Sequence, residues 1–253
     1  MNNYKTILTK IQNGEALTLD FVGDSVTRGI NHCTDEETYV ARFASYTAEK
    51  FAECAVNRYD GIAPDELLPI DHFEGPKVIS KGHGGATIDI IRNGVGGNTV
   101  LRAHKRIDDF TGTLANGKRP DLTFMMFGIN DSLIHVPDRY ATPEVFKENY
   151  RNLINAIKEK NPETLFIIMT PTTNDKDVSA HAEKVRELGA EEGIAVIDTN
   201  ALWSEHYDPS ADNFGHGDWL KGGRDACHPT PKGADATAKF VFEKFIKLIS
   251  ERN

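Results

Sequence analysis

The stretch Leu17-Thr-Leu-Asp-Phe-Val-Gly-Asp-Ser25-Val-Thr-Arg-Gly29 decides the fold of this chain. Its first half alternates apolar and polar residues and ends apolar, which predicts a strand over residues 16–22 that is buried on both faces. Gly23 and two small polar residues then favour a turn into a helix. Ser25 therefore lies at the carboxyl end of a buried strand, where open α/β sheets bind ligands. A helix N-terminus there would stabilise an oxyanion, so Ser25 is a candidate nucleophile.

Apolar runs and amphipathic periods alternate along the rest of the chain. The periods predict helices near residues 4–12, 37–54, 99–110 and 178–192, one that begins at Thr142, and a last one from Thr230 to about 249. The apolar runs predict further strands near residues 87–92, 122–127, 165–169 and 194–198. This alternation predicts a parallel sheet covered by helices on both sides, which is an α/β fold.

Residues 1–253 are expected to form a single domain, because we find no linker, internal repeat or low-complexity segment. Residues 55–86 contain three prolines and a Gly-His-Gly-Gly run. We expect this segment to be an irregular insertion with at most a short strand at residues 78–79, and long loops of this kind are usually functional or misassigned.

Charge and cysteine content narrow the class of protein. The net charge of −9 and the pI near 5.5 argue against nucleic acid and anionic membrane surfaces as partners. The chain has three cysteines (Cys33, Cys54 and Cys227). Because the count is odd and the spacings fit no metal motif, we expect reduced thiols rather than disulfides. The N-terminus lacks the apolar core of a signal peptide. We expect a cytoplasmic protein, although a secreted protein after removal of its signal peptide would share these features.

A serine nucleophile needs a base that is oriented by a carboxylate. In the run Asp225-Ala-Cys-His228, the aspartate is the only one in the chain with a histidine three residues later. A tight turn at this spacing brings the carboxylate to the imidazole Nδ1 and leaves Nε2 facing outward. The run follows the last predicted strand, so it belongs to the same sheet edge as Ser25. Six of the other histidines (His32, His72, His83, His104, His135 and His181) have no partner pattern and are expected to be surface or core residues.

An acyl-transfer site also needs hydrogen-bond donors for the oxyanion. Gly96 and Gly97 follow the second predicted strand and can present backbone N–H groups without an intervening side chain. Asn130 follows the third predicted strand and can point an amide N–H into the same crevice. Ser25 could instead be a helix cap, Asn130 a turn residue and Gly97 a loop glycine, and such structural roles are compatible with a catalytic one.

Four short blocks resemble those of the SGNH (GDSL) hydrolases and follow the order of that family. They are Gly23-Asp24-Ser25 with Thr27, Gly97 within residues 93–99, Gly128-Ile-Asn130-Asp131, and Asp225-Ala-Cys-His228-Pro229. The resemblance implies a flavodoxin-like three-layer α/β/α sandwich around a five-stranded parallel sheet of order 2-1-3-4-5. It also implies Ser25 as nucleophile, His228 as base, Asp225 as its orienting carboxylate, and an oxyanion hole from Ser25, Gly97 and Asn130. No metal or other cofactor is implied.

Substrate contacts are less specifically indicated. Trp203 and Trp219 precede the Asp225 loop and could form a wall for a sugar ring or an acyl chain. Asp24 is a further candidate contact, although Asp24 and Asp131 are more simply explained by hydrogen bonds that hold their loops. The acidic and histidine residues of segment 205–218 are of the types that bind metals, but their spacing matches no compact metal-binding motif. No metal site is therefore expected there.

These observations predict a serine esterase that acts on small carboxylic esters, with O-acetyl groups on carbohydrates as the favoured substrates. The expected partner is therefore a small-molecule or oligosaccharide ester, and the sequence leaves homo-oligomers open. Three alternatives remain: a lysophospholipase or thioesterase, a non-catalytic carbohydrate-binding relative on the same fold, and, least favoured, a metal-dependent hydrolase built on the region of His216 and Asp218.

Overall fold

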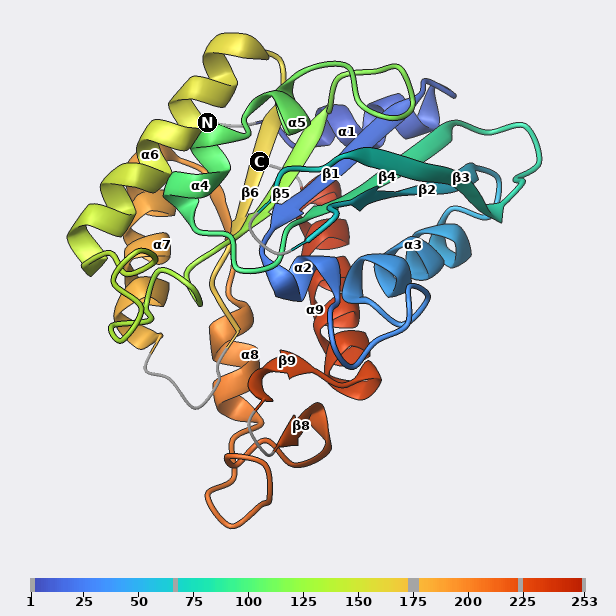
Figure 1. Cartoon of the computed structure of the whole chain (residues 1–253). Helices are drawn as coiled ribbons and strands as arrows, with labels where there is room; N and C mark the ends of the chain where they lie inside the picture. The colour runs from blue at the N-terminus through green and yellow to red at the C-terminus, as the bar shows by residue number, and fades with distance from the viewer. Residues whose placement is uncertain (1–2, 66–67, 173–177, 223–224, 252–253) are drawn as a thin grey trace.

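The computed structural model describes residues 3–65, 68–172, 178–222 and 225–251, and shows a central sheet covered by helices on both faces (Figure 1). Five parallel strands lie in the order β4-β1-β5-β6-β7, which is the predicted 2-1-3-4-5 order. Their bounds are β1 (Leu17–Gly23), β4 (Thr87–Gly94), β5 (Leu122–Met126), β6 (Leu165–Met169) and β7 (Ala195–Ile197). The α/β class and the strand order predicted from the sequence are thus confirmed.

Segment 55–86 is not the irregular insertion that we expected. It contains β2 (Ala55–Ile62), which pairs in parallel with β4, and β3 (His72–Ser80), which pairs antiparallel with β2 at the sheet edge. The sheet therefore has seven strands in the order β3-β2-β4-β1-β5-β6-β7. Two features hid these strands: β3 is a largely exposed edge strand that contains a proline, and two of the buried positions of β2 are the charged Arg58 and Asp60. Residues 66 and 67 lie outside the described ranges.

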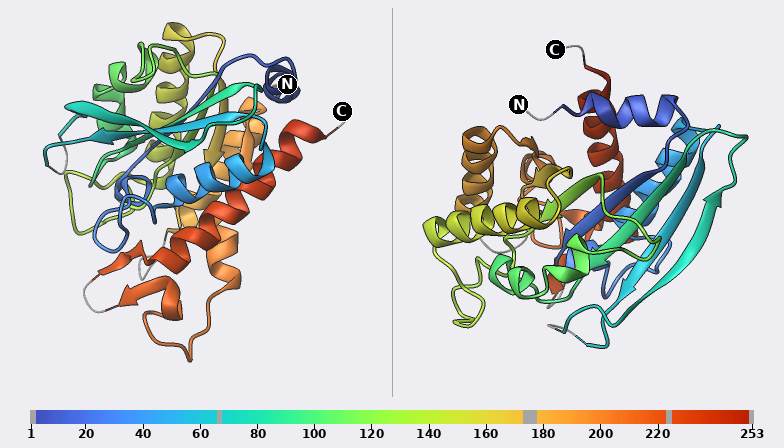
Figure 2. Two further views of the ribbon diagram at one scale, coloured as in Figure 1. Left: turned by 90° about the vertical axis from the view of Figure 1, so that its right-hand side faces the viewer. Right: turned by 90° about the horizontal axis from the view of Figure 1, so that it is seen from above.

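Helices cover the two faces of the sheet in separate groups (Figure 2). One face carries α1 (Lys5–Gln12), α3 (Tyr39–Lys50) and α9 (Pro231–Ser250), and the other carries α4 (Val100–Lys105), α6 (Pro143–Lys160) and α7 (Ser179–Glu192). The hydroxyls of Thr38, Thr142 and Thr230 cap α3, α6 and α9, each by accepting a hydrogen bond from a backbone N–H three residues on. No helix in the described ranges is long and apolar enough to cross a membrane.

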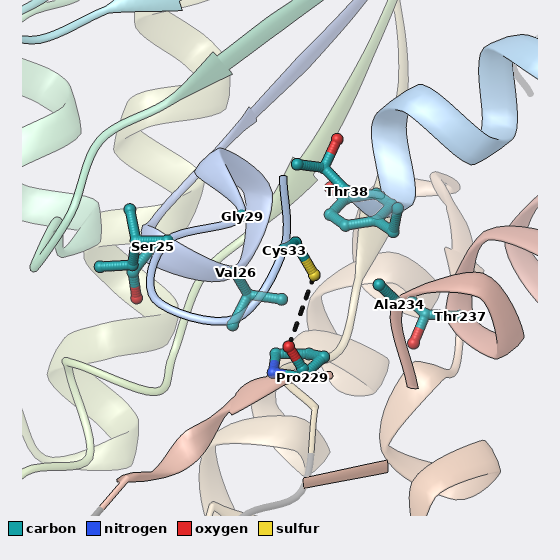
Figure 3. A pocket seen from close by; sticks show the side chains of 10 residues that line it. Ser25, Val26, Gly29, Cys33, Thr38, Pro229, Ala234 and Thr237 are labelled. Atoms are coloured by element: carbon teal, nitrogen blue, oxygen red, sulfur yellow. Dashed lines mark hydrogen bonds between the residues drawn. The ribbon is translucent and has the colours of Figure 1, made fainter. Parts of the chain in front are cut away.

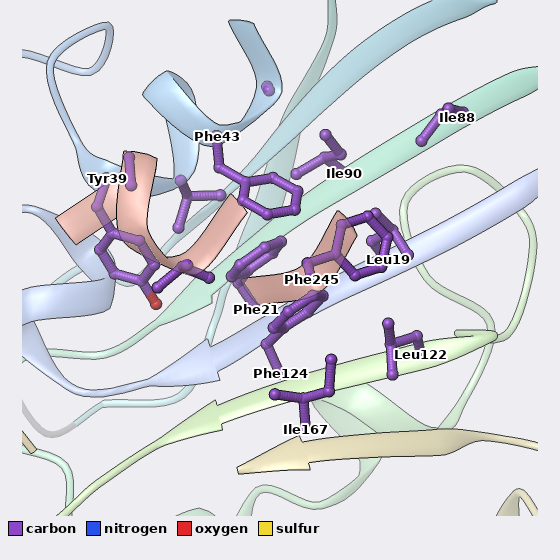
Figure 4. Close-up of a cluster of buried hydrophobic side chains, with 14 of the residues drawn as sticks. Leu19, Phe21, Tyr39, Phe43, Ile88, Ile90, Leu122, Phe124, Ile167 and Phe245 are labelled. Atoms are coloured by element: carbon purple, nitrogen blue, oxygen red, sulfur yellow. The ribbon is translucent and has the colours of Figure 1, made fainter. Parts of the chain in front are cut away.

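Aromatic rings dominate the core under α3 and α9 (Figure 4). The Phe21 ring of β1 stacks on the Phe124 ring of β5 with centroids 4.3 Å apart. Phe43 of α3 and Phe245 of α9 pack against these two rings from the helical layer. The alternate side chains of β1, namely Thr18, Asp20 and Val22, are buried as well, and Val22 belongs to the second core, which forms under α4, α6 and α7. β1 is thus buried on both faces, as its apolar sequence predicted.

The carboxyl ends of three strands lie at one level, since Gly23 is in register with Gly94 of β4 and with Met126 of β5. The segments that follow these strands consequently meet at one edge of the sheet. After β7 the chain forms α8 (Thr199–Glu205), a short 3-10 helix (Gly217–Trp219), and the antiparallel strands β8 (Leu220–Gly222) and β9 (Asp225–Pro229). β9 contacts the short helix α2 (Ser25–Arg28) that follows β1.

Candidate active site

Ser25 is the first residue of α2, directly after the end of β1. The helix cap is Asp24, whose Oδ1 accepts a hydrogen bond from the Val26 N–H at 2.9 Å. Ser25 is therefore not the cap, and its residue is 6% exposed. The helix ends at Gly29, which has a φ of +78° and donates its N–H to the Ser25 carbonyl at 2.8 Å. This single helical turn orients the backbone around the candidate nucleophile.

His228 and Asp225 form a hydrogen-bonded pair on β9. The imidazole Nδ1 lies 2.8 Å from Asp225 Oδ1 and 3.0 Å from Oδ2. The Asp225 Oδ1 also accepts the N–H groups of Cys227 and His228 at 3.3 and 3.2 Å. Partial burial acts to raise the pKa of Asp225, but the His228 imidazole and the hydrogen bonds from Asn31 and the His228 backbone outweigh it and lower that pKa to about 2. The carboxylate is thus held in its ionised form.

Two further residues reach Asp225 from the loop after α2. Asn31 donates from Nδ2 to Asp225 Oδ2 at 2.9 Å, and its backbone has a φ of +73°. His32 places Nε2 at 2.8 Å from the same Oδ2. The expectation that His32 is a simple surface or core residue is therefore wrong. No local signal marked either contact, because the loop and β9 are far apart in the sequence.

The loops that carry Gly97 and Asn130 are joined by two hydrogen bonds. Asn130 donates from Nδ2 to the Asn98 carbonyl at 3.0 Å, and the Val100 N–H donates to Asp131 Oδ1 at 3.1 Å. Gly97 has a φ of +67°, a left-handed conformation that glycine adopts without steric cost. The two donor segments predicted for an oxyanion hole therefore lie side by side at the sheet edge.

Asp24 and Asp131 are buried carboxyl groups next to these segments. Burial raises the pKa of Asp24 to about 7 and that of Asp131 to about 8, and hydrogen bonds from backbone N–H groups only partly offset this effect. The expected loop-holding role of both residues agrees with their hydrogen bonds to Val26 and Val100. Because Asp24 is 1% exposed, the structure does not support it as a substrate contact.

The candidate nucleophile and base lie on elements that touch, since α2 and β9 are in contact. Within the described ranges, no hydrogen bond joins the Ser25 hydroxyl to His228, and such catalytic hydrogen bonds often shorten only when substrate binds. A mainly apolar cavity lies between α2, α3, β9 and α9 (Figure 3). Ser25 borders this cavity on the side opposite Ala234 and Thr237.

Of the two tryptophans expected to form a binding wall, Trp203 is a core residue, whereas Trp219 is partly exposed. Trp203 is 0% exposed and donates from Nε1 to Thr237 Oγ1 at 3.1 Å, so it belongs to the core. Trp219 is half-buried and stacks on the His206 ring with centroids 3.7 Å apart. The aromatic side chain of Trp203 therefore indicated a core position and not a substrate contact. Among the described residues, no group of His, Cys, Asp and Glu has the arrangement of a metal site.

A sequence model of the GDSL-like Lipase/Acylhydrolase family matches residues 75–236. This range is more than half of the chain and includes Gly97, Asn130, Asp225 and His228, while Ser25 precedes it. A search of curated protein sequences returned no match.

Several solved structures share the fold. They include a two-domain esterase (CEX) active on acetylated mannans, at a TM-score of 0.66 and 17% identity over 99% of this chain and 54% of that one. An acetyl xylan esterase, AlAXEase, aligns at a TM-score of 0.62 and 17% identity over 90% of this chain and 99% of that one. A protein from Parabacteroides merdae described as a GDSL-like lipase aligns at a TM-score of 0.61 and 18% identity, over 92% of this chain and 96% of that one. The present chain thus spans about half of the two-domain esterase. From the matched range and the fold together, we conclude that this chain belongs to the GDSL-like lipase/acylhydrolase family.

Proposed function

We propose that this protein is a serine esterase that removes acetyl groups from carbohydrates. The observation that carries the proposal is the Asp225–His228 pair, with its 2.8 Å hydrogen bond, on a strand in contact with the helix that begins at Ser25. A base that is oriented by a carboxylate is what a serine hydroxyl requires to act as a nucleophile. The acetylated-carbohydrate substrate is supported by the fold neighbours, which are described as active on acetylated mannans or as an acetyl xylan esterase.

In the proposed mechanism, Ser25 Oγ attacks the ester carbonyl carbon while His228 Nε2 takes the hydroxyl proton. The bond between the carbonyl carbon and the sugar oxygen then breaks, and His228 returns the proton to that oxygen. The acetyl group remains on Ser25. Water attacks this acyl-enzyme with His228 again as base, acetate leaves, and Ser25 recovers its proton.

The oxyanion of each tetrahedral intermediate would receive hydrogen bonds from the N–H groups of Ser25 and Gly97 and from Asn130 Nδ2. Such donors act where negative charge develops in the transition state, and for that reason they lower the barrier. Asp225 keeps the Nδ1–H of His228 directed at its own carboxylate, which leaves Nε2 to face the nucleophile.

The test is a screen of acetylated mannan and xylan oligosaccharides together with p-nitrophenyl esters from acetate to octanoate. We expect the acetate esters to give the highest kcat/KM and Ser25→Ala to abolish turnover. Ser45→Ala is the matched control, because the Ser45 hydroxyl donates to the Ala41 carbonyl of its own helix α3 and its loss should leave activity unchanged.

Two outcomes would contradict the proposal. A preference for octanoate or longer esters would indicate that the protein is a lysophospholipase or a thioesterase. Binding of oligosaccharides without hydrolysis of any ester would assign a carbohydrate-binding protein that uses the same fold.

A further inference from the structure

Arg139 contacts the side chain of Asn130. Its Nη1 donates to Asn130 Oδ1 at 3.1 Å. Arg139 lies in the connection between β5 and α6, where its own N–H donates to the Val136 carbonyl at 2.8 Å. This contact bears on the candidate oxyanion hole, since Asn130 is one of its three expected donors.

The hydrogen bonds of Asn130 leave one donor position open. A side-chain amide has two N–H donors and one carbonyl acceptor. One N–H goes to the Asn98 carbonyl at 3.0 Å and the carbonyl accepts from Arg139, while the residue is 5% exposed. The reversed amide would set two oxygens against each other at Asn98 and two donors against each other at Arg139. The amide is therefore held in one orientation with one N–H free for a ligand.

The charge of Arg139 is not neutralised by a carboxylate. In the part of the chain that the structure describes, Arg139 forms no ion pair, and its Nε is buried without a hydrogen-bond partner. Arg102 differs, because it pairs with Asp138 at 2.7 Å. A guanidinium bonded to a carbonyl oxygen polarises the amide and makes its N–H groups better donors. An uncompensated positive charge near a developing oxyanion also lowers its energy.

We propose that Arg139 is a positioning residue of the oxyanion hole: it holds the Asn130 amide in its donating orientation and strengthens its free N–H through the hydrogen bond to Oδ1. This inference rests on the proposed esterase function and extends it to a residue that does not itself touch the reacting atoms.

The test measures kcat, KM and the thermal midpoint for p-nitrophenyl acetate in Arg139→Met, Arg139→Lys, Asn130→Ala and the double variant Asn130→Ala/Arg139→Met. Since the hydrogen bond from a charged guanidinium is among the stronger ones, we expect Arg139→Met to lower kcat by roughly 10–100-fold with KM changed by less than about twofold. Arg139→Lys keeps the charge and should recover part of the loss. Arg119→Met is the control for loss of a surface guanidinium, because the side-chain hydrogen bond that Arg119 forms within the described residues goes to the Lys160 carbonyl, away from the candidate site.

The double variant separates positioning from independent action. If Arg139 acts through Asn130, its removal in the Asn130→Ala background lowers kcat by less than about threefold, because neighbouring groups in one network are not additive. Full additivity, an unchanged kcat in Arg139→Met, or a raised KM with unchanged kcat would each overturn the inference. If Arg139→Met cannot be purified, equal kcat values for Arg139→Lys, Arg139→Gln and the unmodified protein would overturn it instead. An unmodified protein without esterase activity would overturn the proposed function, whereas an active one with normal Arg139 variants overturns only this inference.

Discussion

Asp225 accepts hydrogen bonds from several directions, and this set of contacts determines its charge. His228, Asn31 and two backbone N–H groups donate to it, and His32 lies 2.8 Å away. Because the pKa of Asp225 is lowered to about 2, its contribution to stability is present above the unfolded pKa of ~3.9 and is lost as the pH falls towards 2. Asp225 therefore remains a carboxylate across the pH range in which a histidine base operates.

Asn31→Gly tests how much the contact from Asn31 contributes to the orientation of Asp225. Glycine tolerates the φ of +73° at this position, so the variant removes the hydrogen bond to Asp225 without backbone strain. We expect kcat for p-nitrophenyl acetate to fall by roughly tenfold, since a hydrogen bond to a charged group contributes about 1.5–3 kcal/mol. KM should change little. A kcat equal to that of the unmodified protein would show that His228 and the backbone suffice to orient the carboxylate.

At the scale of elements, α2 depends on the absence of a side chain at the end of β4. A Cβ on Gly94 would lie 2.3 Å from the Arg28 nitrogen and 2.7 Å from the Thr27 carbonyl carbon, both of which are backbone atoms. Neither atom can move unless the helix moves. The position of Ser25 is thereby coupled to a glycine on the neighbouring strand.

Gly94→Ala is expected to displace α2 and to reduce activity more than stability. Overpacking of this kind costs about 1–3 kcal/mol in unfolding free energy. A displacement of the nucleophile by about 1 Å can cost on the order of 100-fold in rate. Urea unfolding and kcat for p-nitrophenyl acetate measure the two effects. Gly112→Ala is the control, because its nearest contact would be the Asp108 carbonyl at 3.3 Å, and similar results for both variants would contradict the argument.

A buried ionic network joins β2 and β3, the two strands that the sequence did not predict, to β4 and to the loop after α2. Asp60 of β2 is 0% exposed and pairs with Arg58 at 3.0 Å, Arg92 at 2.9 Å and Lys77 at 2.8 Å. Arg92 in turn pairs with Asp35 at 2.7 Å, a residue of the loop that also carries Asn31 and His32. Charged groups thus take the place of apolar packing between β2, β4 and this loop.

Asp60→Ala should strongly destabilise the fold, because it leaves two buried guanidinium groups without their shared carboxylate. Removal of one partner from a buried ionic group typically costs about 3–5 kcal/mol. Chemical denaturation measures the change. Asp71→Ala is the matched control, since Asp71 is exposed and its ion pair among the described residues is with the neighbouring, exposed His72, so its midpoint should stay within experimental error. Equal midpoints for the two variants would mean that water compensates the network.

For the whole molecule, the buried acids Asp24 and Asp131 make stability depend on pH. Their pKa values are raised by burial to about 7 and about 8, so the folded state binds protons that the unfolded state has released. Their contribution is fully present below the unfolded pKa of ~3.9 and is lost as the pH rises through 7 and 8.

Asp131→Asn is expected to weaken this dependence. The amide oxygen can still accept the hydrogen bond from Val100, and the buried charge cannot form. Denaturation at pH 5 and pH 8 should show a smaller loss of stability for this variant than for the unmodified protein. The exposed Asp212→Asn is the control, and a parallel loss in Asp131→Asn would contradict the raised pKa.

The sequence by itself determined five of the seven strands (β1, β4, β5, β6 and β7), and the resemblance of its motifs to a known family predicted the strand order and the family. The predictions at the candidate site depended on local patterns, each of which fixes the backbone geometry of a few residues: Gly23-Asp24-Ser25, Asn130, and the spacing of Asp225 and His228. The prediction from the sequence was wrong at β2, because charged residues occupy buried positions of that strand. It was also wrong at Trp203, because an aromatic residue suits a core as well as a binding wall.

Only the tertiary structure decided which distant residues support the candidate site. Asn31 and Asp225 are separated by 194 positions, and the contact between His32 and Asp225 joins the same two distant segments. Arg139 and Asn130 instead lie in one connection, between β5 and α6, and the fold of that connection brings their side chains together. A hydrogen bond between remote segments leaves no periodicity or spacing in the sequence, because it depends on how the strands order those segments at the sheet edge. The candidate residues of the site were therefore readable from local motifs, while the groups that contact them from distant segments were set by the packing of the whole chain.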